Sequence, residues 1–108
     1  MRLDDRSILS YNLLVMIKSW KHKGLKELFL KGTQKGIRPD MAARIRRRLD
    51  VLDAADSLKA LGLPGFRLHP LSGDMIGRYS IRVTGNWRIT FRFESGDVFD
   101  VNLEDYHG

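Results

Sequence analysis

The sequence predicts an α+β fold in which two N-terminal helices pack on a twisted, mostly antiparallel β-sheet. Between His22 and Leu61, apolar residues recur at the spacing of a helix. After Pro64 they alternate with polar residues in the period of two that strands require. Short turn signals separate the alternating segments, as in strands joined by hairpins. The chain has 108 residues, which suits one domain with its own core.

The first half predicts one strand followed by two helices. Residues 13–20 are apolar and β-branched enough for a strand. Residues 22–32 have helical spacing, and Gly32 ends that helix. Pro39, followed by an aspartate, starts the second helix, which the sequence GLPG at 62–65 ends. The core-facing side of this second helix consists of Met41, Ile45, Leu49 and Leu52.

The second half predicts a short extended segment and three strands. The segment covers 66–71, and the strands cover 78–83, 87–93 and 98–103, with the turns TGN and ESGD between them. Alternation assigns one side of each strand to the core and the other to the outside. The residues expected to face the core are Tyr79, Ile81, Val83, Trp87, Ile89, Phe91, Phe93, Phe99, Val101 and Leu103. Those expected to face outward are Arg88, Thr90 and Arg92.

The charge of the chain is positive and unevenly distributed. Nineteen Lys and Arg against 13 Asp and Glu give a net charge of +6. Residues 1–63 carry a net charge of +7, and residues 64–108 carry −1. This excess favours nucleic acid or an anionic membrane as partner, and a solvated basic surface is the alternative. The absence of cysteine excludes thiol chemistry and fits a cytoplasmic location.

The first fifteen residues do not have the pattern of a signal peptide. Asp4 and Asp5 precede the apolar run, and no small-x-small cleavage site follows it. No stretch is long enough to span a bilayer. We therefore expect residues 1–15 to be an N-terminal extension, residues 16–108 to form the domain, and Met16 to be the natural start.

Residues 69–107 contain the side chains that RNA cleavage without a metal requires. A base must take the proton of the ribose 2′-hydroxyl, and an acid must protonate the departing 5′-oxygen; His69 and His107 suit these roles. Arg88 suits the phosphate because its planar guanidinium binds bidentately and stays charged. Tyr106 suits stacking on a base, and Asp105 suits orientation of the neighbouring imidazole.

Each of these residues also has a simpler interpretation. His69 precedes a proline, as a turn or edge residue does, and the terminal Asp-Tyr-His can be an ordinary frayed tail. His69, Asp105 and His107 also resemble a metal site, but Asp-x-His is a weak pattern, and the sequence predicts neither metal nor cofactor. Two groups of arginines can be solvated faces rather than phosphate contacts. They are Arg82, Arg88 and Arg92 opposite Asp100 and Glu104, and Arg44, Arg47 and Arg48 on the second helix.

Three segments together resemble HigB-type toxins of the RelE superfamily. They are MIKSWKHKGLKELFLKG, RLHPLSGDMIGRYSIRVTGNWRITFRFESGD and the terminal EDYH. The resemblance runs from Met16 to His107. It implies a ribosome-dependent mRNA interferase that cuts mRNA in the A site without a metal. It also implies a HigA-like helix-turn-helix antitoxin as partner and no role for a membrane.

The resemblance places the family's catalytic site on five residues. They are His69, Arg88, Asp105, Tyr106 and His107. The basic first half, through Arg44, Arg47 and Arg48, and the sheet residue Arg82 are expected to contact RNA, including ribosomal RNA. Ser72 and Thr84 stand where some members carry basic residues, so the efficiency and codon preference of the chain stay open. The alternative function is a non-catalytic toxin on the same scaffold that binds DNA gyrase.

Overall fold

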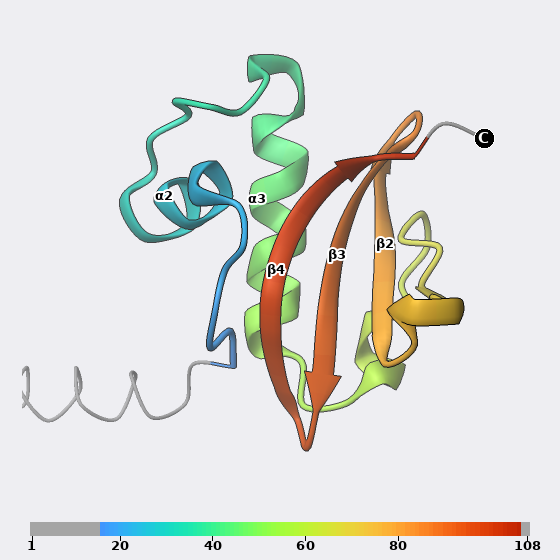
Figure 1. Ribbon diagram of the computed structural model, residues 1–108. Coiled ribbons are helices and arrows are strands. Elements are labelled where there is room, and N and C mark those ends of the chain that lie inside the picture. Colours follow the sequence, from blue (N-terminus) through green and yellow to red (C-terminus); the bar gives the residue numbers. More distant parts are fainter. Residues whose placement is uncertain (1–15, 107–108) are drawn as a thin grey trace, which may run out of the picture.

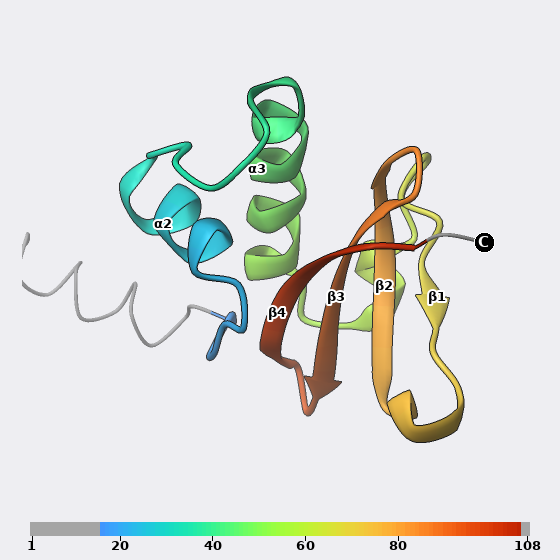
Figure 2. The same cartoon turned by 45° about the horizontal axis from the view of Figure 1, so that its top comes forward.

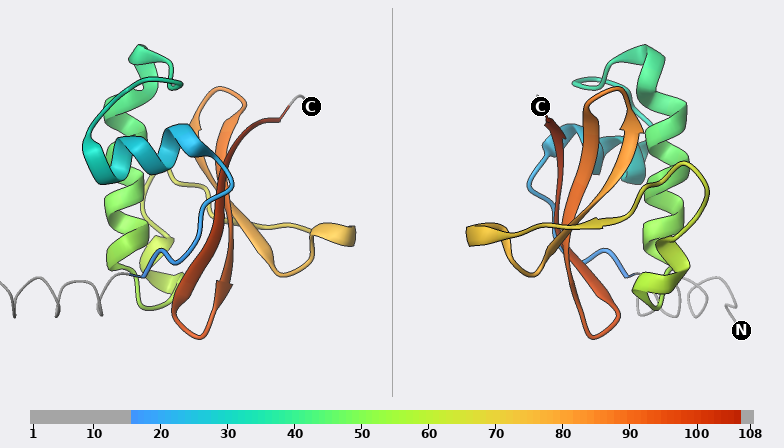
Figure 3. Two further views of the ribbon diagram at one scale, coloured as in Figure 1. Left: turned by 60° about the vertical axis from the view of Figure 1, so that its left-hand side comes forward. Right: turned by 90° about the vertical axis from the view of Figure 1, so that its right-hand side faces the viewer.

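The computed structural model describes residues 16–106, which form two layers (Figures 1 and 3). One layer holds the helices α2 (Lys23–Lys31) and α3 (Pro39–Ala54), and the other is a four-stranded antiparallel sheet. The predicted α+β class is confirmed. Within these described residues, no helix is long and apolar enough to cross a bilayer.

The strands follow one another in the sheet in the same order as in the chain. Their bounds are β1 (His69–Pro70), β2 (Arg78–Thr84), β3 (Trp87–Glu94) and β4 (Asp97–Asp105). Each pairs antiparallel with the next, and the short β1 lies beside β2 at one edge (Figure 2). Two short 3₁₀ helices complete the fold: η1 (Leu58–Leu61) and η2 (Gly73–Met75).

The core lies between the helices and the face of the sheet that the predicted alternation assigned to it. Ile81 and Val83 of β2 and Ile89 and Phe91 of β3 are buried there, at most 1% exposed. The four apolar residues predicted for the second helix are also buried. Among residues 16–106, no helix covers the opposite face of the sheet (Figure 3), which is the face that the alternation assigns to Arg88.

The helices begin where the sequence predicts, but the second one ends earlier. Gly32 caps α2 in the left-handed conformation with φ 76°, which glycine adopts without steric cost. Pro39 opens α3, where its missing N–H is not needed. The predicted continuation of α3 to 62–65 is wrong, because Ala55 is extended (ψ 125°) and packs in the core. The chain then forms η1 as a separate turn.

The predicted strand at 13–20 is only partly present. Its first three residues lie outside the described residues, and 16–20 runs alongside β4 through isolated parallel bridges. Backbone bonds join Lys18 N to Val98 O (2.7 Å) and Val98 N to Met16 O (2.8 Å). The segment therefore ties the N-terminal side of α2 to the last strand.

A β-bulge in β4 changes which residues face the core. Thr90 pairs with Asn102 and Arg92 pairs with Phe99, so two residues of β4 stand opposite Phe91 alone. Asp100, inside the bulge, has φ 56°. As a result Val98 is fully buried, whereas Phe99 lies under the Arg92 guanidinium, 4.5 Å from its carbon to the ring centroid. The assignment of Phe99 to the core was wrong, and that of Val101 was right.

Arg48 differs from the solvated helix face expected for it. Its side chain is buried, and its Nε donates to the carbonyl oxygen of Arg82 at 2.6 Å. The guanidinium carbon also lies 4.7 Å from the centroid of the Phe66 ring. Arg48 therefore joins α3 to β2, which is a packing role and leaves it poorly placed to contact RNA.

The stability of the protein should fall at mildly acidic pH because of His22. The Nδ1 atom of His22 caps α2 by accepting from Leu25 N at 3.1 Å. Burial lowers the pKa of His22, opposed in part by a hydrogen bond with its own backbone. The unfolded chain then takes up the proton first, so stability is full above the ordinary pKa of ~6.5 and decreases as pH falls through the lowered value.

The comparison variant is His22→Asn, whose amide oxygen can cap the helix without titrating. We expect the melting temperature of the parent, followed by circular dichroism, to drop more steeply than that of His22→Asn between about pH 7 and pH 5. Equal slopes for the two proteins would contradict this role of His22.

Candidate active site

A cleft opens on the face of the sheet opposite the helices. Its volume is about 410 Å³, and strands and turns distant in sequence line it. β1 contributes His69, β2 contributes Ser80, β3 contributes Arg88, and Tyr106 follows β4. The remaining lining residues are Pro70, Leu71, Ser72, Gly85 and Asn86. The fold therefore gathers His69, Arg88 and Tyr106, three of the residues predicted for catalysis, in one cleft.

Arg88 brings a positive charge to this cleft, and a side chain of the adjacent strand holds its guanidinium. Its Nη1 atom donates to the hydroxyl of Ser80 at 3.2 Å. Ser80 is fully buried in the adjacent strand, so its hydroxyl is a fixed acceptor. Arg82 is the register partner of Arg88 on β2, which brings a second guanidinium-bearing residue to the neighbouring strand. The two like charges favour an anion on this part of the sheet.

Tyr106 is fixed by its backbone, although the chain ends two residues later. Its N–H donates to the carbonyl oxygen of Asn86, in the turn between β2 and β3, at 2.8 Å. Burial raises the pKa of the Tyr106 phenol, and the carboxylate of Glu104 raises it further. Arg78 and Arg88 act in the opposite direction. The phenol therefore stays protonated at neutral pH and can donate a hydrogen bond in the cleft.

His69 stands at the edge of the sheet and borders the cleft from β1. Its Cα is the register partner of Ser80, the residue that supports Arg88. Its side chain is exposed to solvent, which leaves the imidazole accessible to a ligand. The edge position suggested by the following proline is thus correct, and it does not conflict with a place in the site.

Three of the other predicted site residues, Asp105, Arg44 and Arg47, do not line the cleft. Asp105 pairs with Trp87, and alternation along β4 puts it on the sheet face opposite Arg88. His107 lies outside the described residues. Arg44 and Arg47 are exposed on α3, in the other layer, where Arg44 Nη1 donates to Val83 O at 3.4 Å. Within residues 16–106 no group of three His, Asp or Glu side chains could hold a metal ion.

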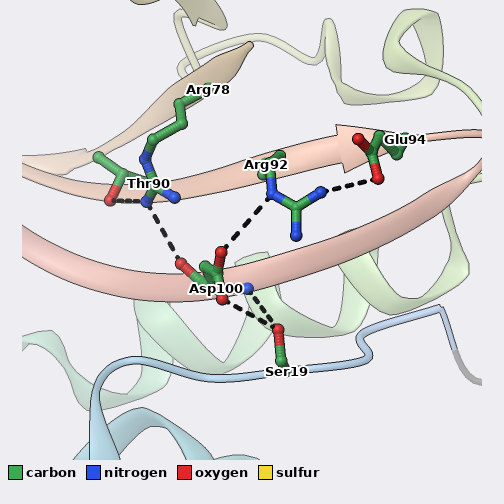
Figure 4. Close-up of polar contacts among 6 residues, drawn as sticks. All are labelled: Ser19, Arg78, Thr90, Arg92, Glu94 and Asp100. Carbon is green, nitrogen blue, oxygen red and sulfur yellow. Dashed lines mark hydrogen bonds and ion pairs between the residues drawn. The ribbon is translucent and has the colours of Figure 1, made fainter. Parts of the chain in front are cut away.

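Sequence reasoning missed a buried polar network beside the cleft. Thr90, expected to face solvent, is fully buried, and its hydroxyl donates to Glu104 Oε2 at 2.6 Å. Arg78 Nη2 donates to Thr90 Oγ1 at 3.1 Å and to the carbonyl oxygen of Asp100 at 3.2 Å (Figure 4). The sequence indicated only that Thr90 lies on the outward side of β3. That position does not distinguish a polar residue covered by other side chains from one in contact with solvent.

The cleft therefore combines a fixed guanidinium, an accessible imidazole and a protonated phenol. A guanidinium binds phosphate oxygens, an imidazole can accept or give a proton near neutrality, and a phenol can donate a hydrogen bond. Together these groups suit a phosphate ester whose cleavage needs proton transfer and charge stabilisation.

Comparisons with known proteins point to the same chemistry. A family model described as the RelE-like toxin HigB of type II toxin–antitoxin systems matches residues 18–107. The chain is 50% identical over 92 residues to the endoribonuclease HigB of Proteus vulgaris. That alignment covers 85% of this chain and all of the relative.

The raised pKa of Tyr106 can be measured directly. We expect the phenolate absorbance of Tyr106, taken as the difference between the parent and Tyr106→Phe, to appear above the ordinary pH range of a tyrosine. The Glu104→Gln variant should shift that transition to lower pH, because it removes a charge that disfavours the phenolate. A difference spectrum that titrates in the ordinary range would contradict the described environment.

Proposed function

The chain belongs to the HigB-like toxin family of type II toxin–antitoxin systems, and on that premise we propose that it cleaves mRNA in the ribosomal A site by attack of a ribose 2′-hydroxyl. The family supplies the reaction class: it is an endoribonuclease toxin with RNA as substrate and an antitoxin as partner. The observation that carries the rest of the proposal is the meeting of His69, Arg88 and Tyr106 in one cleft.

The proposed reaction has two coupled proton transfers around one phosphate. The 2′-oxygen loses its proton to a base and bonds to phosphorus, and the bond from phosphorus to the 5′-oxygen breaks. The leaving oxygen takes a proton from an acid, which gives a 2′,3′-cyclic phosphate and a 5′-hydroxyl end. We propose His69 for one of these transfers and His107 for the other.

Arg88 is proposed to hold the scissile phosphate. Negative charge builds on the non-bridging oxygens as the 2′-oxygen attacks, and a fixed cation stabilises that charge most. The bond from Arg88 to Ser80 supports this, because it limits the motion of the guanidinium before RNA arrives. Tyr106 would donate a hydrogen bond or pack against a base. For Asp105, on the other face, we propose orientation of His107 rather than contact with RNA.

The ribosome and a HigA-like helix-turn-helix antitoxin are the proposed macromolecular partners. Arg44 and Arg47 are exposed on α3, which lies in the helical layer (Figure 3), and they are proposed to contact ribosomal RNA while the cleft holds mRNA. Arg82 is proposed to contact the mRNA backbone near Arg88. Binding through these arginines should weaken as salt concentration rises.

Substitution of the cleft residues tests the proposed chemistry. We expect His69→Ala and Arg88→Ala to lower the cleavage rate by about 100-fold or more, because each removes a group that acts on the transition state. Cleavage is measured by primer extension on mRNA in a cell-free translation reaction. Lys31→Ala, at an exposed site in the helical layer, is the matched control and should cut like the parent.

Two results would contradict the proposal. One is a parent protein that blocks translation without producing cut mRNA. The other is a folded His69→Ala or Arg88→Ala variant that cuts as fast as the parent.

A further inference from the structure

Arg88 and Glu104 are cross-strand neighbours that do not pair with each other. The register of β3 and β4 places them directly opposite, where opposite charges ordinarily attract. The ion pairs found among residues 16–106 do not include this one. Arg88 instead donates to Ser80, and Glu104 accepts from Thr90. A neighbouring side chain therefore holds the Glu104 carboxylate away from the Arg88 guanidinium.

The hydroxyl of Thr90 has the geometry to do this. The distance from Thr90 Oγ1 to Glu104 Oε2 is 2.6 Å, the length of a charge-assisted bond from a hydroxyl to a carboxylate. Asn102 Nδ2 lies 3.4 Å from the same carboxylate oxygen. Thr90 is fully buried, so no solvent competes for its hydroxyl.

Arg78 fixes the direction of that hydroxyl. A threonine hydroxyl has one hydrogen to donate and two lone pairs to accept with. Because Arg78 Nη2 already donates to Thr90 Oγ1 (3.1 Å), the single hydrogen of Thr90 is directed to Glu104. Arg78 is itself held by the carbonyl oxygen of Asp100 in the bulge, as Figure 4 shows. The result is a relay from the bulge through Arg78 and Thr90 to Glu104.

We propose that Thr90 is a positioning residue for the ribonuclease site: its hydroxyl holds Glu104 so that Arg88 is not taken up by an ion pair and stays available to the RNA phosphate. This inference rests on the proposed function of Arg88. Without the hydroxyl, Glu104 is free to turn to the guanidinium opposite it and compete with the phosphate. An ion pair of about 1 kcal/mol would weaken phosphate binding about fivefold.

A double-mutant cycle on Thr90 and Glu104 tests the proposal. Thr90→Val keeps the shape of the side chain and removes the hydroxyl, Glu104→Gln removes the competing charge, and Thr90→Ser is the control that keeps a hydroxyl. Binding is measured as the Kd for a 2′-O-methyl RNA oligonucleotide, which cannot be cut, and cleavage is measured separately with unmodified mRNA.

The rescue is the decisive result. We expect Thr90→Val to weaken the Kd about fivefold or more, with the cleavage loss appearing in KM rather than kcat. Thr90→Val combined with Glu104→Gln should return to within about twofold of Glu104→Gln alone. A purely structural role for Thr90 predicts no rescue, because removing the carboxylate cannot repair a damaged strand.

Three outcomes separate this inference from the proposed function. A folded Thr90→Val that binds like the parent, or a double variant as weak as Thr90→Val, overturns the inference. If the Kd shows the expected loss and rescue but the parent cuts no mRNA, the role of Thr90 is supported and the proposed ribonuclease function is overturned. If the melting temperature shows that Thr90→Val does not fold, Thr90→Ala removes the same hydroxyl with a smaller side chain, and the same cycle applies.

Discussion

The β-bulge at Asp100 is the constraint on which the rest of this structure depends. Its left-handed backbone (φ 56°) adds one residue to β4 and reverses the side-chain alternation there, so Val98 and Val101 both reach the core. The bulge is held from several directions. Ser19 Oγ accepts from Asp100 N at 2.8 Å, and Arg92 Nε lies 3.6 Å from Asp100 Oδ2 (Figure 4). One residue thus joins the N-terminal segment, β4 and the open face of the sheet.

The same bulge connects the core to the chemistry of the cleft. The carbonyl oxygen of Asp100 accepts from Arg78, and Arg78 donates to Thr90, which lies on β3 opposite Asn102. After the bulge, β4 stays in register with β3 as far as Asp105. The backbone N–H of Tyr106 then donates to the carbonyl oxygen of Asn86. The backbone of Tyr106 is therefore held beside the turn between β2 and β3, and its side chain lines the cleft.

Much of the fold was predictable from local sequence signals. Gly32 and Pro39 mark helix ends through backbone geometry, and the alternation in β2 and β3 identifies Ile81, Ile89 and Phe91 as core residues. The face of the sheet on which Phe99 lies was not predictable, because a bulge at a non-glycine residue such as Asp100 leaves no local signal in the sequence. It depends on Ser19, which lies 81 positions earlier in the chain.

The residue types of the candidate site were predictable from the sequence, whereas the tertiary contacts around them were not. The residue types of His69, Arg88 and Tyr106 indicate phosphate chemistry, and the strand order brings them together. Two features depend on tertiary contacts that sequence patterns do not show. Arg48 is buried because the carbonyl oxygen of Arg82 accepts from it, and Thr90 is buried because neighbouring polar side chains cover it.

Removal of the chain end tests most directly whether the cleft that Tyr106 lines is the site of the proposed ribonuclease reaction. A stop codon after Glu104 deletes Asp105, Tyr106, His107 and Gly108 and leaves the buried core residues of β4, Val98 and Val101, in place. The account predicts a truncated protein that unfolds cooperatively, with a far-ultraviolet circular dichroism spectrum like that of the parent, and that produces no cut mRNA in a translation reaction. A folded truncated protein that still cuts mRNA at the parental rate would contradict it.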